Sequence, residues 1–142
     1  MKRRTLLKFL PAVTLLPALL RDAEAQDSAG SSVVYELRVY HAAPGKLADL
    51  LARFRDHTVK IFDRHGLKSV AYWTPTDEPE KSNTLIYILR HPSREAAAAN
   101  WKAFGDDPEW KSVRDKSEVN GKLAEKVDST YMAMTDFSPA LQ

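Results

Sequence analysis

Apolar and polar positions alternate along residues 33–40, with the period of two that is expected of a β-strand. One side of this stretch carries Tyr35, Leu37 and Val39, and the other side carries Glu36, Arg38 and Tyr40. The pattern predicts a strand with one apolar face and one face that holds a charged pair.

A helical period follows directly after Pro44 and Gly45. Apolar or small residues recur at spacings of three and four, at Leu47, Leu50, Leu51, Phe54, Thr58, Ile61, Phe62 and His65. This spacing predicts one amphipathic helix from about residue 45 to residue 65. Gly66 is well placed to end it, because glycine readily adopts the left-handed conformation that closes helices.

The remaining pattern predicts two strands, two helices and a last strand. The strands are expected at 69–74, 85–90 and 126–135, and the helices after Pro92–Ser93 and after Asp107–Pro108. Ala97, Trp101 and Phe104 would form the inner stripe of the first of these helices, with Gly105 ending it, and the second would run toward Asn120–Gly121. The order of elements predicts an α+β, ferredoxin-like βαββαβ fold.

Two of the predicted strands are apolar on both faces. Residues 70–73 and 85–89 place apolar or aromatic side chains on each side of the sheet, whereas the helices of this fold cover only one side. The second side therefore needs another cover, and the sheet of a second copy would supply it. The sequence thus predicts a homodimer.

Four segments in the same order resemble the NIPSNAP family of the dimeric α/β-barrel superfamily. They are residues 34–40, Pro44–Leu47, Leu67–Trp73 and Asp107–Trp110, and the resemblance spans residues 33–137. It implies a ferredoxin-like fold that dimerises through its sheet, and a family without an agreed enzymatic reaction. The polar stretch Lys116–Gly121 departs from the family pattern, so no role tied to that region is carried over.

The first 25 residues read as a signal peptide. A basic start, an apolar stretch of about a dozen residues and Ala23–Ala25 as a cleavage site follow one another. Arg3–Lys8 resembles the bacterial twin-arginine pattern, which predicts a periplasmic or secreted protein; general secretion or a retained anchor are the alternatives. The apolar stretch is too short to span a membrane. Residues 26–32 would be a flexible linker, and 138–142 a C-terminal tail.

The basic balance of the chain belongs to this N-terminal segment. Residues 1–25 hold five basic and two acidic side chains; subtracting these from the 21 and 19 of the whole chain leaves the remainder near −1. We therefore expect no nucleic-acid partner and, once the signal is removed, no membrane association. The chain has no cysteine, which excludes disulfides and thiolate chemistry.

Candidate binding residues come from the charged pair and from the aromatic positions. The candidate pocket consists of Glu36, Arg38, Tyr40, His65, Tyr72, Trp73, Tyr87 and Trp101. Aromatic side chains at these periods are usually core, but they could also line a cavity for a small hydrophobic or aromatic ligand. Glu36 and Arg38 share a strand face, where they could form a salt bridge within the sheet or a dimer interface, or a charged wall of the pocket.

Two functional hypotheses remain open. His41, His57, His65 and His91 show no spacing typical of a metal site, and glycine-rich phosphate loops and hydrolase signatures are absent. The first hypothesis is therefore a domain that binds a small molecule or a protein partner, without a cofactor or catalytic role. The second, drawn from relatives within the barrel superfamily, is a cofactor-independent monooxygenase or a haem-binding enzyme that uses the cavity between sheet and helices.

Overall fold

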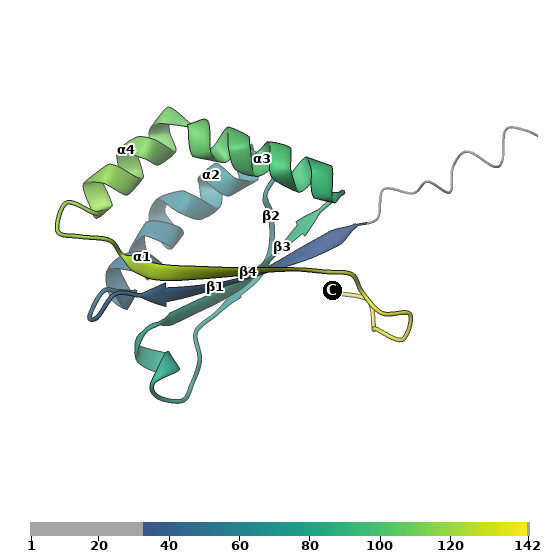
Figure 1. Cartoon of the computed structure of the whole chain (residues 1–142), viewed down its shortest axis with the longest axis horizontal. Helices are drawn as coiled ribbons and strands as arrows, with labels where there is room; N and C mark the ends of the chain where they lie inside the picture. The colour runs from purple at the N-terminus through teal and green to yellow at the C-terminus, as the bar shows by residue number, and fades with distance from the viewer. Residues whose placement is uncertain (1–32, 142) are drawn as a thin grey trace, which may run out of the picture. The chain divides into compact units, whose positions relative to one another are not determined.

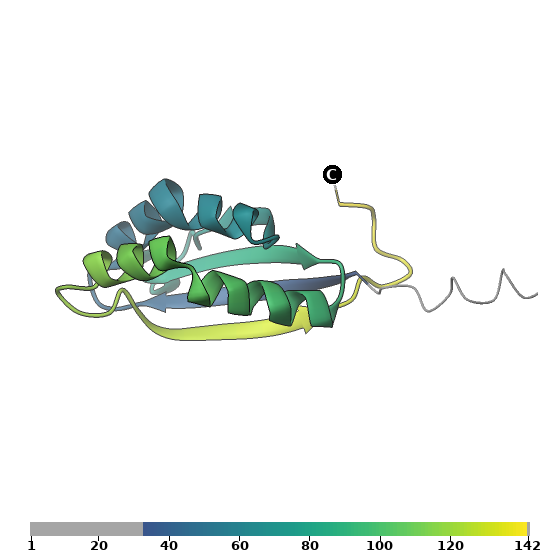
Figure 2. The same cartoon turned by 90° about the horizontal axis from the view of Figure 1, so that it is seen from above.

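The computed structural model describes residues 33–141. The predicted signal peptide (1–25) and linker (26–32) lie outside the described residues. Four antiparallel strands form one sheet in the order β2-β3-β1-β4. They are β1 (Val34–Ala42), β2 (Lys68–Trp73), β3 (Thr84–His91) and β4 (Ala124–Met132), and a short 3-10 turn, η2 (Glu80–Ser82), connects β2 to β3. The helices lie on one side of this sheet (Figures 1 and 2). The predicted α+β, ferredoxin-like fold is confirmed.

The predicted helix over 45–65 contains a π-helical turn. It is divided into α1 (Leu47–Arg53), η1 (Phe54–Thr58) and α2 (Val59–Arg64). In η1 the N–H of Val59 donates to the carbonyl of Phe54, five residues back, and the Thr58 hydroxyl donates to the Arg53 carbonyl at 3.2 Å. Gly66 follows with φ of 73°, as predicted for the residue that ends the helix. The turn inserts one extra residue into the helical repeat.

Both predicted caps of the later helices are confirmed. Ser93 precedes α3 (Arg94–Asp106), and its side chain accepts a hydrogen bond from the N–H of Ala96. Asp107 precedes α4 (Pro108–Ser117), and its carboxylate accepts from the N–H groups of Glu109 and Trp110. None of the helices among residues 33–141 is long and apolar enough to cross a membrane.

The prediction that Gly105 ends α3 is wrong. The helix continues through Gly105 to Asp106, because a single glycine weakens a helix without breaking it. The chain instead leaves the helix at Asp107, whose backbone is extended (φ −61°, ψ 122°). The following Pro108 requires this conformation of the residue before it.

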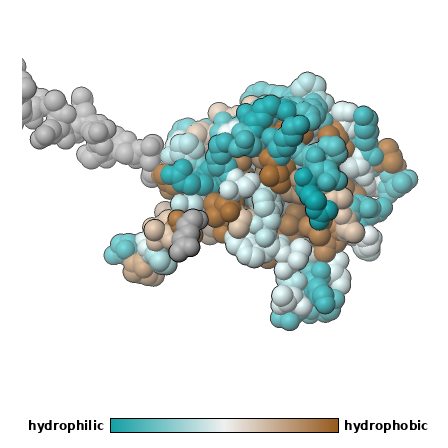
Figure 3. Space-filling view, turned by 180° about the vertical axis from the view of Figure 1, so that it is seen from behind, coloured by the Kyte–Doolittle hydropathy of each residue, from teal (hydrophilic) through white to brown (hydrophobic). Residues whose placement is uncertain are grey.

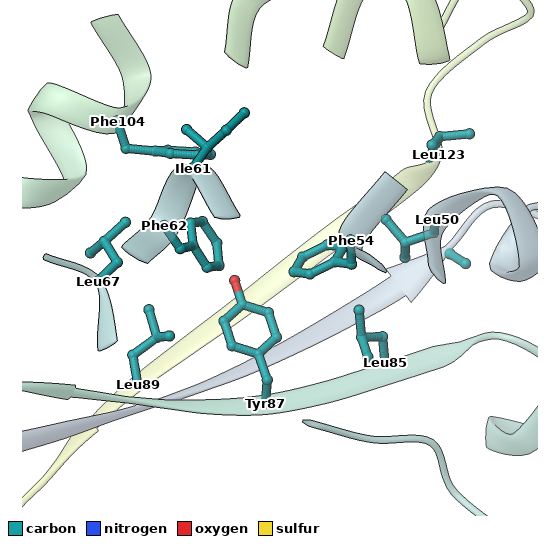
Figure 4. Close-up of a cluster of buried hydrophobic side chains, with 11 residues drawn as sticks. Leu50, Phe54, Ile61, Phe62, Leu67, Leu85, Tyr87, Leu89, Phe104 and Leu123 are labelled. Atoms are coloured by element: carbon teal, nitrogen blue, oxygen red, sulfur yellow. The ribbon is translucent and has the colours of Figure 1, made fainter. Parts of the chain in front are cut away.

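The core lies between the helices and the inner face of the sheet. Tyr87 of β3 is fully buried, with its ring 5.4 Å from that of Phe54 and 5.9 Å from that of Phe62. Figure 4 shows Tyr87 pointing from the strand toward these two rings, with Leu85 and Leu89 on either side of it. The space between sheet and helices is filled here by aromatic side chains that pack on one another.

The opposite face of the sheet, called here the outer face, is apolar in the middle of β1 and β3 and polar along β4, where Lys126 and Asp128 lie. In the sheet register Leu37 lies opposite Ile88 and Val39 lies opposite Ile86, and these side chains alternate with the inward-facing Tyr87. They are partly exposed, because the helices of residues 33–141 cover the inner face. Figure 3, seen from the side opposite to that of Figure 1, shows hydrophobic residues exposed between hydrophilic ones.

Candidate functional site

The Glu36 carboxylate lies within hydrogen-bond distance of four polar side chains. Glu36 points inward from β1 and is only 1% exposed. It accepts hydrogen bonds from the side chains of Arg38 (3.1 Å), Ser129 (2.7 Å) and Trp101 (2.7 Å), and His91 Nε2 lies 3.0 Å away. These five residues, from β1, β3, α3 and β4, form what we call the Glu36 cluster.

The hydrogen bonds of the cluster keep Glu36 ionised. Burial by itself raises the pKa of this carboxyl group, but hydrogen bonds from His91, Ser129 and Trp101 and the charge of Arg38 outweigh burial. The pKa is lowered from 4.5 to about 2. At neutral pH the cluster therefore contains a buried carboxylate whose acceptor positions are taken by donors from three other elements.

Arg38 is held by two neighbouring aromatic side chains as well as by Glu36. Its guanidinium carbon lies 4.6 Å from the Trp101 ring and 5.7 Å from the Tyr40 ring. Its Nη2 donates to the Tyr40 hydroxyl at 3.4 Å, and the Tyr87 hydroxyl donates to the same oxygen at 3.3 Å. Burial by itself lowers the pKa of Arg38, but Tyr40, Tyr87 and Glu36 raise it by more than burial lowers it. The net effect is a raised pKa, so the side chain stays charged.

The Arg38 guanidinium is held by its neighbours, yet its side chain remains partly accessible to solvent. Its side chain is 19% exposed, and its buried Nε has no hydrogen-bond partner among the described residues. The guanidinium has five N–H donors, and Glu36 and Tyr40 receive one bond each. Arg38 is therefore a rigid cation on the inner face of the sheet, and not all of its N–H donors are used.

The structure brings most of the predicted pocket residues together. Glu36, Arg38, Tyr40, Tyr87 and Trp101 meet on the inner face. Tyr72 joins them through its ring, which lies 5.3 Å from that of Tyr87.

Two predicted pocket residues lie elsewhere. Trp73 is paired with Ile86 on the outer face and is 47% exposed. His65 follows α2, where its Nε2 lies 2.6 Å from the carboxylate of Asp107.

Two members of the Glu36 cluster were not part of the predicted pocket. The sequence marks His91 only as a histidine without a metal spacing, and it gives no signal for Ser129. Strand alternation places both on the inner face once the register is known, since Glu36 pairs with Leu89 and Arg38 pairs with Ser129. His91 is completely buried, and its Nδ1 has no partner among the described residues.

A second polar cluster joins α2 to the start of α4. Asp107, 8% exposed, accepts from Arg64 at 2.7 Å, and His65 Nε2 lies 2.6 Å away. The hydrogen bond with His65, followed by that from Arg64, lowers the pKa of Asp107 below its ordinary range. Asp107 thus caps α4 and also ties the two helices together.

Asp107→Ala is expected to lower the melting temperature by several degrees, because it removes the α4 cap and the shared partner of Arg64 and His65. Thermal denaturation followed by circular dichroism measures the effect. Asp106→Ala is the matched control, since this neighbouring aspartate is exposed and its only side-chain partner among the described residues is Lys102. Equal melting temperatures for the two variants would contradict the assigned role.

The described residues do not form a metal site. Within residues 33–141, no group of three or more histidine, aspartate or glutamate side chains could hold a metal ion. The Nε2 atoms of His41, His65 and His91 each lie within hydrogen-bond distance of a carboxylate. The Nε2 atoms of these three histidines are therefore engaged, whereas His57 is exposed in η1 and has no carboxylate partner among the described residues.

The fold and site together define a ferredoxin-like α+β domain with a rigid buried ion pair at the inner face of its sheet. The sequence model of the NIPSNAP family matches residues 35–139. The chain belongs to the NIPSNAP family, as the resemblance of its segments predicted.

Solved structures share this fold. An uncharacterised NIPSNAP-like domain protein from Burkholderia xenovorans is 18% identical, with a TM-score of 0.67 over 79% of this chain and 93% of that one. A NIPSNAP family protein of unknown function from Agrobacterium tumefaciens is 24% identical, with a TM-score of 0.65 over 79% and 96%.

A more distant likeness reaches a protein from Chloroflexus aurantiacus that is named for the antibiotic biosynthesis monooxygenases. It is 13% identical, with a TM-score of 0.50 over 78% of this chain and all of that one. At these identities the likenesses describe the fold alone. A search of curated proteins finds no match to the chain.

Proposed function

We propose that the chain is an exported, dimeric NIPSNAP domain that binds a small aromatic carboxylate beside Arg38 and catalyses no reaction. The observation that carries this proposal is the Arg38 guanidinium itself, which is fixed by Glu36, stacked on Trp101 and still partly exposed. A guanidinium held in this way is suited to a carboxylate. The aromatic side chains around it, Trp101 and Tyr40, favour an aromatic ligand over an aliphatic one.

The Glu36 cluster supports binding over catalysis. A general base works best with a pKa near the operating pH, whereas the pKa of Glu36 is lowered to about 2. Its oxygens are also occupied by four side chains. Glu36 therefore serves to orient Arg38, and an enzyme of the monooxygenase or haem type would need reactive groups that this cluster does not supply.

Titration with benzoate, followed through the indole N–H signal of Trp101 in NMR spectra, tests the proposed site. We expect a saturable shift of this signal with benzoate and none with benzamide, which lacks the charge. Arg38→Gln should abolish the shift, while Arg90→Gln, which removes an exposed arginine from β3, should leave it unchanged. A shift that survives Arg38→Gln would place the ligand elsewhere.

The dimer is proposed from the outer face of the sheet. Leu37, Val39, Ile86 and Ile88 form a continuous apolar surface across β1 and β3, and a surface of this kind is usually covered by another chain. A second copy would cover it sheet to sheet, as the pattern of the strands predicts.

Leu37→Lys is expected to convert the protein from a dimer to a monomer, because it buries a charge at the centre of the proposed interface. Light scattering coupled to size-exclusion chromatography measures the mass. Val119→Lys serves as the control, since Val119 is 76% exposed and lies outside the sheet. A wild-type protein of monomer mass would refute the proposal.

Export and the absence of a cofactor belong to the same proposal. Native mass spectrometry and an absorbance spectrum of protein exported and purified without added cofactor examine both. We expect a colourless homodimer whose polypeptide mass corresponds to a chain cleaved near residue 25. Extra bound mass or a Soret band would favour the enzyme hypothesis instead.

A further inference from the structure

A groove of about 650 Å³ lies between the α1–η1 segment and α4. None of the residues that line it belongs to the Glu36 cluster, and the proposed function above makes no use of it. Its size falls in the range of small-molecule sites in proteins, about 300–1,000 Å³. We call it the α1–α4 groove.

One side chain of the groove is a buried arginine with spare donors. Arg53 is 7% exposed. Its Nη1 donates to the Ser117 hydroxyl at 3.1 Å and to the Glu118 carboxylate at 3.0 Å, and its guanidinium carbon lies 5.2 Å from the Trp110 ring. Its buried Nε has no partner among residues 33–141. Arg53 is therefore anchored through Nη1, whereas its Nη2 forms no hydrogen bond among residues 33–141 and is the donor that a ligand in the groove could use.

The groove also presents side chains of both charges. Asp49 and Asp56 line it from the α1–η1 side, and Lys116 and Glu109 line it from the α4 side, where Glu109 is already paired with Arg64 at 2.8 Å. Asp56 and Lys116 form no salt bridge among the described residues, and Asp49 is paired only with Lys46, at 3.5 Å. A ligand with a single charge would meet a like charge within the groove. A ligand with one charge of each sign would find a partner for both.

The π-helical turn shapes the groove wall. Asp56 and His57 both lie in η1 and line the groove, so the extra residue of this turn determines how they stand relative to Arg53 at the end of α1. A π turn is rare and is frequently found at functional sites. The π turn is a feature of the backbone and does not depend on the burial of Arg53, yet both lie along the same groove.

We propose that the α1–α4 groove binds a small zwitterion of the amino-acid type. Arg53, supported by Lys116, receives the carboxylate, and Asp49 and Asp56 receive the ammonium group. His57 and Ser112, which also line the groove, lie where the ligand's side chain can reach them. This site is separate from the one beside Arg38, so each can be refuted without the other.

NMR titration of the full-length chain with L-glutamine tests this site. We expect saturable shifts of the backbone amide signals of residues 52–57 and 112–117. Propionate and propylamine, which each carry one of the two charges, should produce no saturable shift at the same concentrations. Saturable shifts with either one alone, or none with glutamine, would overturn the proposal.

Substitutions in the groove test whether glutamine binding depends on Arg53 and Asp56 or only on the overall charge of this surface. Arg53→Lys keeps the charge but loses the planar donor set, so it should weaken glutamine binding about tenfold. Arg55→Lys is the matched control, since Arg55 lies two residues further on in η1, is exposed and does not line the groove. Asp56→Asn, at an exposed position whose change leaves the core intact, should also weaken binding. Unchanged affinity in both Arg53→Lys and Asp56→Asn would refute the site.

Discussion

Glu36→Ala is expected to lower the free energy of unfolding by about 3–5 kcal/mol, the usual effect of breaking a buried ion pair from one side. The substitution leaves Arg38 and Trp101 without their shared acceptor at a position where the Glu36 side chain was only 1% exposed. Urea denaturation measures the change. Glu125→Ala is the control, because Glu125 is exposed on β4 and forms no salt bridge among the described residues.

The pH dependence of unfolding provides a second readout of the same carboxylate. The pKa of Glu36 is lowered from 4.5 to about 2 in the folded chain, so the folded state favours its ionised form. This contribution is fully present above pH 4.5 and is lost as the pH falls from there toward 2. Glu36→Gln cannot ionise, so its stability should fall less than that of the wild type across this range. Parallel curves would contradict the assignment.

Phe62→Ala is the other substitution with a large expected effect, about 3–5 kcal/mol in the free energy of unfolding. Phe62 is 1% exposed, and its ring lies 4.9 Å from that of Phe104 and 5.4 Å from that of Trp101. Its removal leaves a cavity at the point where α2, α3 and the sheet meet, and rigid neighbours fill such cavities poorly.

Phe137→Ala provides the comparison for this core substitution. It deletes the same atoms from a residue that is 84% exposed, so the free energy of unfolding should change by less than about 0.5 kcal/mol. Both variants are measured by urea denaturation at one protein concentration, because dissociation of a dimer would otherwise contribute. A similar loss in both would mean that Phe62 does not anchor the core.

The elements of the fold could be predicted from the sequence because their signals are local. Ser93 and Asp107 each stand directly before a helix that they cap, and the alternation around Glu36 and Arg38 placed both on one strand face. The predicted pairing of these two side chains is confirmed at 3.1 Å. Periodicity and caps depend on residues a few positions apart, which one sequence displays in full.

The partners of Glu36 could not be predicted because they depend on sheet register. His91 and Ser129 lie 55 and 93 residues away along the chain, and only the pairing of β1 with β3 and β4 brings them together. The position of Trp73 follows from a register shift between Ser69 and Ala71, which fixes Tyr72 on the inner face and Trp73 on the outer face. A register shift of one residue moves every following side chain of the strand to the other face of the sheet, and the local sequence pattern does not predict such a shift.

The π turn also lacks a signal in the sequence. Leu50, Phe54 and Thr58 are spaced four apart, which a regular helix would satisfy equally well. The turn became visible only in the bond from Val59 to the carbonyl of Phe54.

This turn has a consequence for comparing NIPSNAP sequences. A helical residue turns the chain by about 100°, so a relative without the additional residue would need one position fewer between Arg53 and Val59 to keep both ends of the helix on the same core. Alignments that force equal lengths here would match Asp56 and His57 to the wrong neighbours. A gap of one position, placed inside Phe54–Thr58, would restore the correspondence on both sides.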